Sequence, residues 1–162
     1  MTDTHAHRLA TARSLAAAHG LDLDADVLVG GNYVSVVVHG DVAYLSGQVP
    51  RIGNTVAVTG RVGSAVSLAQ ARVATTICTS RALAILHKAV GLDRVARVLK
   101  LNVFVQSADD FTQHSEVADA ASEVLTAVFG ASSGQHARTS VGVAMLPKDA
   151  AVELDLTVAL MP

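Results

Sequence analysis

Aromatic residues are scarce in this chain, which has two Tyr, three Phe and no Trp. Hydrophobic residues nevertheless make up 51% of its 162 positions, so Ala, Val, Leu and Ile must fill most of the core. Small aliphatic side chains favour thin, closely packed helices and strands. At this length roughly two-thirds of the unfolded surface can be buried, so a single domain needs no disulfide or metal to fold.

Cysteine is almost absent, because Cys78 is the only one. One thiol cannot form an internal disulfide, and no Cys/His group has the spacing of zinc ligands. The N-terminus lacks a basic segment followed by an apolar run, and no stretch approaches the ~18 apolar residues of a membrane span. We therefore expect a cytoplasmic protein that holds no metal and contacts no membrane.

Basic residues are also few. Twelve Lys and Arg stand against 14 Asp and Glu, which gives a formal net charge of −2. Nucleic-acid binding needs clustered cations that neutralise phosphates, and single strands usually need aromatic rings for stacking. The chain has no basic block, so we expect no nucleic-acid partner.

The spacing of apolar residues predicts three helices. Residues 4–19 form a short amphipathic helix that ends before Gly20, and residues 67–90 form a longer one. A third helix is expected to begin at Asp109 or Asp110, either of which is a suitable N-cap residue. The apolar face of this third helix consists of Val117, Ala121, Val124, Leu125 and Val128.

Stretches of β-branched and apolar residues predict the strands. Residues 33–38 and 42–46 are expected to form a hairpin around the turn His39-Gly40-Asp41. The last strand alternates apolar and polar residues, which is the period of a sheet with one buried face. We place a tight turn near Lys148 between the last two strands. The remaining strands are expected at residues 55–58, 95–105, 139–145 and 152–160.

This order of elements predicts an α+β fold in which two helices cover one mixed sheet, with a further helix at the N-terminus. The sequence has no internal repeat and no linker rich enough to divide it. We expect a single domain, with residues 1–30 forming the N-terminal helix and connector and residues 31–162 forming the main body.

Most residues capable of chemistry have a simpler structural interpretation. Cys78 lies on the apolar face of the long helix, where a buried and inert thiol is expected. The seven histidines contain no i, i+4 pair on a helix, and we interpret them as structural or solvent-exposed. The sequence also lacks the nucleotide-binding patterns G-x-G-x-x-G and P-loop and the hydrolase pattern G-x-S-x-G.

Two charged residues near the C-terminus are stronger candidates. Arg138 begins a strand that is otherwise small and apolar, and its guanidinium can offer two parallel hydrogen bonds to a carboxylate. Glu153 lies on the polar side of the last strand together with Asp155, and either is suited to act as a general base. From spacing alone, an exposed arginine at a strand end and solvated surface carboxylates explain these residues at least as well.

Seven short segments occur in an order that is typical of one family. The patterns S-G-Q-x-P and A-R-x-x-V together make this order specific. From about Gly31 to its C-terminus, the chain resembles the RidA/YjgF family of imine deaminases. The segments are G-N-Y-V at 31–34, L-S-G-Q-V-P at 45–50, V-F-V and D-F at 103–105 and 110–111, A-R-T-S-V at 137–141, and L-P and V-E-L at 146–147 and 152–154.

The resemblance implies a chorismate-mutase-like α+β fold that assembles as a homotrimer, with ligand sites between subunits. It also implies that the protein hydrolyses reactive 2-imino acids to 2-oxo acids and ammonia without a cofactor of its own. A non-catalytic module that binds a small carboxylate is an alternative. An endoribonuclease is a weaker one, because the acidic balance of the chain argues against it.

Carried over by position, the resemblance assigns roles to five residues. Arg138 would bind the substrate carboxylate with Ser140 beside it, and Glu153 would place or activate water. Tyr33 and Ser46 would line the cleft. This set is chemically consistent, because an electrophilic imine needs an anchored carboxylate, an oriented water and a proton path to the departing amine.

Two features depart from the best-known members of the family. Ser115 stands where those members have an asparagine on the third helix, so we include it among the substrate-binding residues as an altered contact. The N-terminal helix and the long loop at residues 51–63 resemble a longer subgroup.

The expected turn near Lys148 separates the two catalytic candidates. It would place Arg138 opposite Val158, with Glu153 roughly 16 Å away along the hairpin. One hairpin would not bring both side chains to one small ligand. The sequence therefore predicts a site assembled across a subunit boundary.

Overall fold

The structure, a computed structural model, describes residues 2–162. In chain order it contains the helices and strands α1 (Thr2–Ala17), β1 (Val36–His39), β2 (Val42–Leu45), β3 (Arg51–Ile52), β4 (Thr55–Val56), α2 (Leu68–Ala89), η1 (Leu92–Arg94), β5 (Val95–Gln106), α3 (His114–Gly134), β6 (Ala137–Val143), η2 (Pro147–Asp149) and β7 (Val152–Leu160).

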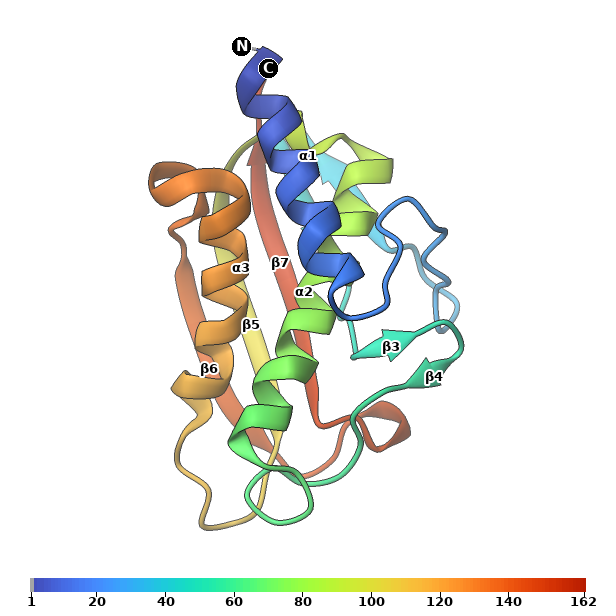
Figure 1. Cartoon of the computed structure of the whole chain (residues 1–162), viewed down its shortest axis with the longest axis vertical. Coiled ribbons are helices and arrows are strands. Elements are labelled where there is room, and N and C mark those ends of the chain that lie inside the picture. Colours follow the sequence, from blue (N-terminus) through green and yellow to red (C-terminus); the bar gives the residue numbers. More distant parts are fainter. Residues whose placement is uncertain (1) are drawn as a thin grey trace.

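A five-stranded mixed sheet forms the centre of the fold, with the order β1-β2-β7-β5-β6. β5 and β6 run parallel, and the other neighbouring strands are antiparallel. β3 and β4 form a separate two-stranded ribbon beside α2 (Figure 1). The predicted α+β class with a mixed sheet is confirmed.

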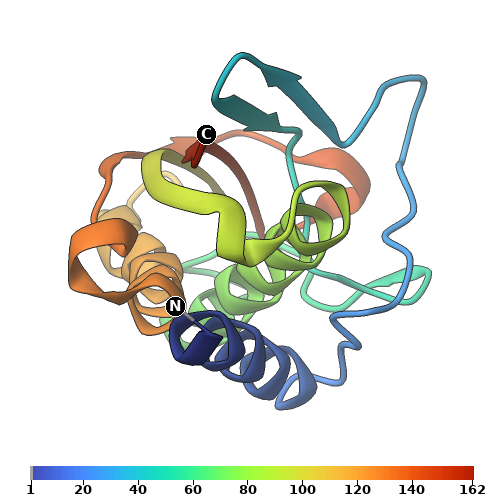
Figure 2. The same cartoon turned by 90° about the horizontal axis from the view of Figure 1, so that it is seen from above.

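All three long helices lie on the same side of the sheet. α2 packs on β7 and α3 packs on β5, while α1 lies on the outside of α2 and α3 (Figure 2). Along β7 the residues alternate between buried and half-buried, as predicted, and the buried set faces the helices. In the part of the chain that the structure describes, no helix covers the other face, which we call the open face.

Two helix ends illustrate how the sequence determines the elements. At the start of α2, Ser67 and Gln70 form a capping box, in which each side chain accepts a hydrogen bond from the other residue's backbone N–H (3.2 and 2.9 Å). After α1, Gly20 adopts a positive φ of 73°, and the Leu21 N–H donates to the Ala16 carbonyl. This arrangement is a Schellman motif, which ends a helix abruptly.

The predictions for α1, α2, the first hairpin and the last strand are confirmed, with small shifts of their ends. The predicted start of the third helix at Asp109 or Asp110 is wrong, because α3 begins at His114 and its N-cap makes no side-chain hydrogen bond. Asp109 Oδ1 instead lies 3.6 Å from Arg61 Nη1, and the Phe111 N–H donates to the Ala108 carbonyl in a turn. The predicted strand at 55–58 is one arm of the β3–β4 ribbon, whose other arm was not expected.

The tight hairpin between the last two strands is also wrong. β6 and β7 do not pair with each other, because β5 lies between them. Arg138 is therefore aligned with Leu101 of β5 and not with Val158.

Across residues 2–162, no helix is both long and apolar enough to cross a membrane.

Candidate functional site

Arg138 lies near the start of the edge strand β6, on the face turned toward α3. Its Nη1 donates to Asp119 Oδ1 (2.7 Å) and to Ser122 Oγ (3.0 Å), and its Nη2 donates to the Ser115 carbonyl (3.4 Å). The side chain is 22% exposed, so it is reachable at the sheet edge. α3 thus fixes the guanidinium of its own chain in one orientation.

Two other predicted residues lie near Arg138. Ser140 is two positions further along β6 and therefore on the same face as Arg138. Ser115 lies in the first turn of α3, where its backbone carbonyl, not its hydroxyl, meets Arg138. The structure therefore brings Arg138, Ser140 and Ser115 together at one edge of the molecule.

Glu153 lies on the open face of β7. Phe104 of β5 lies directly opposite Glu153 and is half-buried, and the exposed Val141 of β6 lies beyond Phe104. Burial raises the pKa of the Glu153 carboxyl above its ordinary value, and the negative charge of Asp155 adds to this effect. Asp155 itself accepts a hydrogen bond from Asn102 Nδ2 (2.8 Å). Glu153 is therefore a partly desolvated carboxyl that holds a proton more readily than usual.

The segment after β2 is placed against Glu153. A Cβ built on Gly47 would lie 2.0 Å from Glu153 Oε1, so only glycine allows this approach. Ser46 is held beside it, because Gln48 Nε2 donates to the Ser46 carbonyl (3.2 Å) and to the Gly47 carbonyl (3.0 Å). The S-G-Q motif thus brings Ser46 to the Glu153 end of β7.

Tyr33 lies in the connector before β1. Its ring packs back on Gly31, and its side chain is among the groups that influence the pKa of Arg81. Tyr33 is 53% exposed, which leaves most of its ring open to a further contact.

The predicted residues therefore form two groups in one chain. Arg138 pairs with Leu101, whose side chain is buried on the helix-covered face, whereas Glu153 pairs with Phe104 on the open face. Strand geometry places the two Cα atoms about 14 Å apart, because they are separated by three residues along the strands and by two strand spacings. The predicted hairpin is wrong, but the predicted separation of Arg138 and Glu153 is found. Their positions on opposite faces of the sheet separate the two side chains further.

Sequence reasoning missed the partners of these residues. Ser115, Asp119 and Ser122 recur at steps of four and three, so they form a polar stripe on α3. Such a stripe on an otherwise apolar helix is a signal that a charged partner lies nearby. Asn102 has no comparable signal, because its contact with Asp155 depends on the register of β5 and β7.

The residues interpreted as structural behave as predicted where the structure describes them. Cys78 is fully buried, and burial raises the pKa of its thiol. His114 lies 3.1 Å from Ser107 Oγ, and His136 lies 3.0 Å from Ser122 Oγ. Among the described side chains, no three His, Cys, Asp or Glu residues are arranged to hold a metal ion.

Comparison with a protein-family model gives a match over most of the chain. The family described as Endoribonuclease L-PSP matches residues 23–160. This range includes every predicted site residue.

Individual relatives agree with that match. Protein TCP17 of Trypanosoma cruzi is 42% identical over 142 residues, which cover 87% of this chain and 89% of TCP17. The crystal structure of Atu1372 from Agrobacterium tumefaciens has a TM-score of 0.86 and 34% identity, covering 98% of this chain and 95% of that one. The crystal structure of the YjgF gene product of E. coli has a TM-score of 0.53 and 28% identity, with coverages of 85% and 94%. The similarity to Atu1372 extends over most of α1.

Proposed function

Because the chain belongs to the Endoribonuclease L-PSP family, also known as the RidA/YjgF family, we propose that it hydrolyses 2-imino acids to 2-oxo acids and ammonia. The observation that carries the proposal is Glu153, a half-buried carboxyl with a raised pKa on the open face. A carboxyl whose pKa is shifted toward neutrality is suited to exchange protons with a reacting group.

In this proposal Arg138 anchors the substrate carboxylate. Asp119 and Ser122 both bind Nη1, which orients the plane of the guanidinium. The opposite edge, formed by Nε and Nη2, offers two parallel N–H groups at the spacing of carboxylate oxygens. The carboxylate of a 2-imino acid would thus be fixed next to Ser140, with its C=N bond directed away from β6.

Glu153 would move the protons. Water oxygen adds to C2 of the imine while one water proton passes to the Glu153 carboxylate and from there to nitrogen. The hydroxyl proton of the adduct follows by the same route, the C2–N bond breaks, and ammonia leaves as the C2=O bond forms. The two hydrogens of water end on nitrogen and its oxygen ends on C2, so no cofactor is needed.

A homotrimer would bring the two groups together. Val37, Tyr44 and Val141 on the open face are 53%, 49% and 40% exposed, so this face presents apolar surface to a partner. Glu153 lies on that same face, and Arg138 lies at the sheet edge. We propose that each site combines Arg138 of one subunit with Glu153 of the next.

A second candidate is a module that binds a small carboxylate without turnover. It is favoured by the arrangement of Arg138, which Asp119 and Ser122 orient without any help from Glu153. Binding would require Arg138 and Ser140 alone.

The test supplies a 2-imino acid from an amino-acid oxidase and follows its loss with semicarbazide as a trap. Wild type should accelerate imine loss. Arg138→Gln should raise KM, and Glu153→Gln should lower kcat by roughly 10²- to 10⁴-fold with little change in KM. Arg13→Gln is the matched control, because Arg13 pairs with Asp24 of the connector and not with any of the predicted residues.

Absence of any acceleration by wild type would overturn the deaminase proposal. If wild type and Glu153→Gln then bind a 2-oxo acid equally well, and Arg138→Gln does not, the protein is a carboxylate-binding module.

A further inference from the structure

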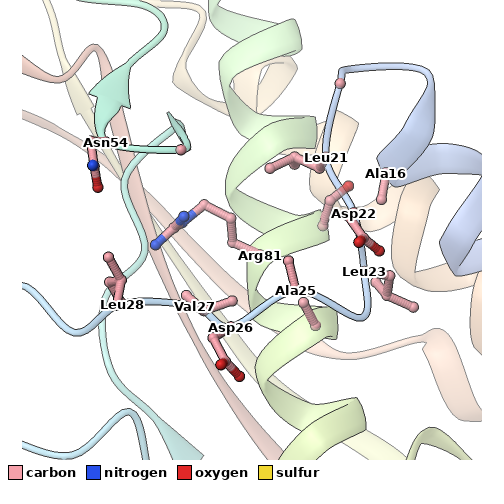
Figure 3. A pocket seen from close by; sticks show the side chains of 14 residues that line it. Ala16, Leu21, Asp22, Leu23, Ala25, Asp26, Val27, Leu28, Asn54 and Arg81 are labelled. Atoms are coloured by element: carbon pink, nitrogen blue, oxygen red, sulfur yellow. The ribbon is translucent and has the colours of Figure 1, made fainter.

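A cavity lies on the far side of α2, apart from Arg138 and Glu153. It has a volume of about 300 Å³, at the lower end of the range of small-molecule sites. The connector after α1, the middle of α2 and the turn of the β3–β4 ribbon enclose it (Figure 3). None of the residues predicted for the deaminase site lines this cavity.

Arg81 is the main polar group of the cavity. Figure 3 shows its side chain reaching from α2 toward the β3–β4 turn, near Asn54 and Leu28. The residue is only 7% exposed. Its single hydrogen bond among the described residues runs from Nη1 to the Arg51 carbonyl (3.2 Å). Arg81 Nε is fully buried and has no partner.

Among the described residues, no carboxylate contributes to the pKa of Arg81. Burial lowers this pKa and the positive charge of Arg51 lowers it further, whereas Cys78 and Tyr33 raise it. The two acidic residues of the cavity are engaged elsewhere, because Asp26 pairs with Lys88 and Asp22 accepts the backbone N–H of Asp24 (3.0 Å). A buried cation without a counter-charge is costly, and a bound anion removes that cost.

A second buried arginine in the same chain provides a contrast. Arg8 donates to the carbonyls of Leu92 and Val95 (3.0 and 2.9 Å), and its guanidinium lies 5.2 Å from the centre of the Phe129 ring. The neighbouring charge that affects its pKa is the negative one of Asp93. Both arginines leave Nε buried without a partner. Arg8, however, donates two hydrogen bonds and has Asp93 nearby, whereas Arg81 donates one hydrogen bond and borders the cavity.

The other lining residues indicate the shape of the ligand. Ser80 is 1% exposed and its hydroxyl has no hydrogen-bond partner, so it is a second buried polar group at this site. The remaining walls are mostly aliphatic and include Leu21, Leu23 and Val27. The exposed acids Asp22 and Asp26 disfavour a second negative charge on the ligand.

We propose that this cavity binds a small monocarboxylate with an aliphatic body. The carboxylate lies on the Nη2 end of the Arg81 guanidinium, and the aliphatic body lies against the connector. Since the connector has no regular secondary structure, a ligand here holds it on α2 and against the β3–β4 turn. The site would therefore accept a ligand independently of the proposed deaminase site.

The test is calorimetric titration of the full chain with 4-methylpentanoate, and with inorganic phosphate in a parallel arm. Arg81→Gln should weaken 4-methylpentanoate binding by about tenfold or more, the loss expected for charge-assisted hydrogen bonds. Leu28→Glu changes a cavity residue that is 61% exposed, so it should leave the fold intact and weaken binding by repulsion. Its matched control is Val29→Glu, which changes the neighbouring exposed residue outside the cavity lining.

Binding that survives in Val29→Glu and Arg138→Gln but falls in Arg81→Gln and Leu28→Glu supports the proposal. The proposal is overturned if wild type binds no 4-methylpentanoate, if phosphate binds as tightly, or if Leu28→Glu binds like wild type. Loss of binding in Arg138→Gln alone would also overturn it, because the carboxylate would then occupy the other site.

Discussion

At the scale of single residues, Glu153 has the most unusual environment of the predicted site residues. It combines partial burial, a like charge at Asp155 and close contact with Gly47. Arg138, in contrast, donates hydrogen bonds to Asp119 and Ser122, which hold its guanidinium in place. The proposed mechanism therefore uses Glu153 for proton transfer and Arg138 for substrate binding.

The raised pKa of Glu153 predicts a specific pH dependence of stability. A carboxyl with a raised pKa binds its proton more tightly in the folded chain than in the unfolded chain. The free energy of unfolding should therefore fall as pH rises from the ordinary carboxyl pKa through the raised value, and it should stay lower above it. Glu153→Gln removes this dependence, so the variant should gain stability relative to wild type at neutral pH but not in acid.

Urea unfolding of both proteins at one protein concentration measures this difference. Glu116→Gln makes the same substitution at an exposed position and is the control. A stability difference between Glu153→Gln and wild type that is the same in acid and at neutral pH would contradict the assigned environment of Glu153.

At the scale of elements, the segment after β2 and the start of β7 meet at an unusually close contact. Gly47 does not have a positive φ, so its role is to leave room for the Glu153 side chain. Gly47→Ala should therefore displace the carboxyl with little effect on the fold. We expect kcat to fall roughly 10- to 100-fold, with KM nearly unchanged because Arg138 is untouched.

A double-mutant cycle checks this contact. Adding Gly47→Ala to Glu153→Gln should cost little further activity, because the displaced group is already inactive. Gly30→Ala is the control, since a Cβ there would meet only Tyr33 at an ordinary 3.7 Å. If Gly47→Ala lowers kcat by the same factor in wild type and in Glu153→Gln, Gly47 acts on something other than Glu153.

Elements with a strong local pattern were predictable from the sequence. The alternation of β7 and the spacing of α2 both follow from burial on one face, and Ser67 and Gly20 signal helix ends through their own backbone chemistry. The start of α3 was not predictable in the same way. There Asp109 interacts with Arg61, a residue far away in the sequence, instead of capping the nearby helix.

The order of the last strands depends on a buried side chain. Gln106 at the end of β5 is 2% exposed; its Oε1 accepts the Leu146 N–H (2.7 Å), and its Nε2 donates to Asp149. These bonds hold the connection between β6 and β7 across the end of β5, so the two strands lie on either side of it. A short connection normally predicts a hairpin, and the hydrogen bonds of the buried Gln106 amide stabilise the exception found here.

At the scale of the whole molecule, the sheet is covered on one face and open on the other. The open face contains the exposed Val37, Tyr44 and Val141, and it also contains Glu153. Arg138 lies at the edge and faces the helices. A single chain therefore separates the proposed anchor from the proposed proton-transfer group, and we propose that a neighbouring copy unites them.

The sequence predicted candidate residues for the site but not how the sheet arranges them. The family motifs identified Arg138, Ser140, Glu153, Ser46 and Tyr33 as candidates, and all of them lie on accessible or half-buried positions. Motifs do not specify which face of a sheet a residue occupies, because that depends on strand order. The separation of Arg138 and Glu153 was therefore predicted from a wrong pairing of strands. That a neighbouring subunit completes the site stays a prediction.

Complementation between inactive subunits tests the central claim most directly. At a substrate concentration well below the KM of wild type, Arg138→Gln and Glu153→Gln should each be nearly inactive as pure proteins. When the two are unfolded together and refolded as mixed trimers, some sites combine an intact Arg138 from one subunit with an intact Glu153 from the other. We predict recovery of roughly a quarter of wild-type imine hydrolysis for random assortment in a closed ring. A mixture that stays as inactive as its two components would contradict the shared site.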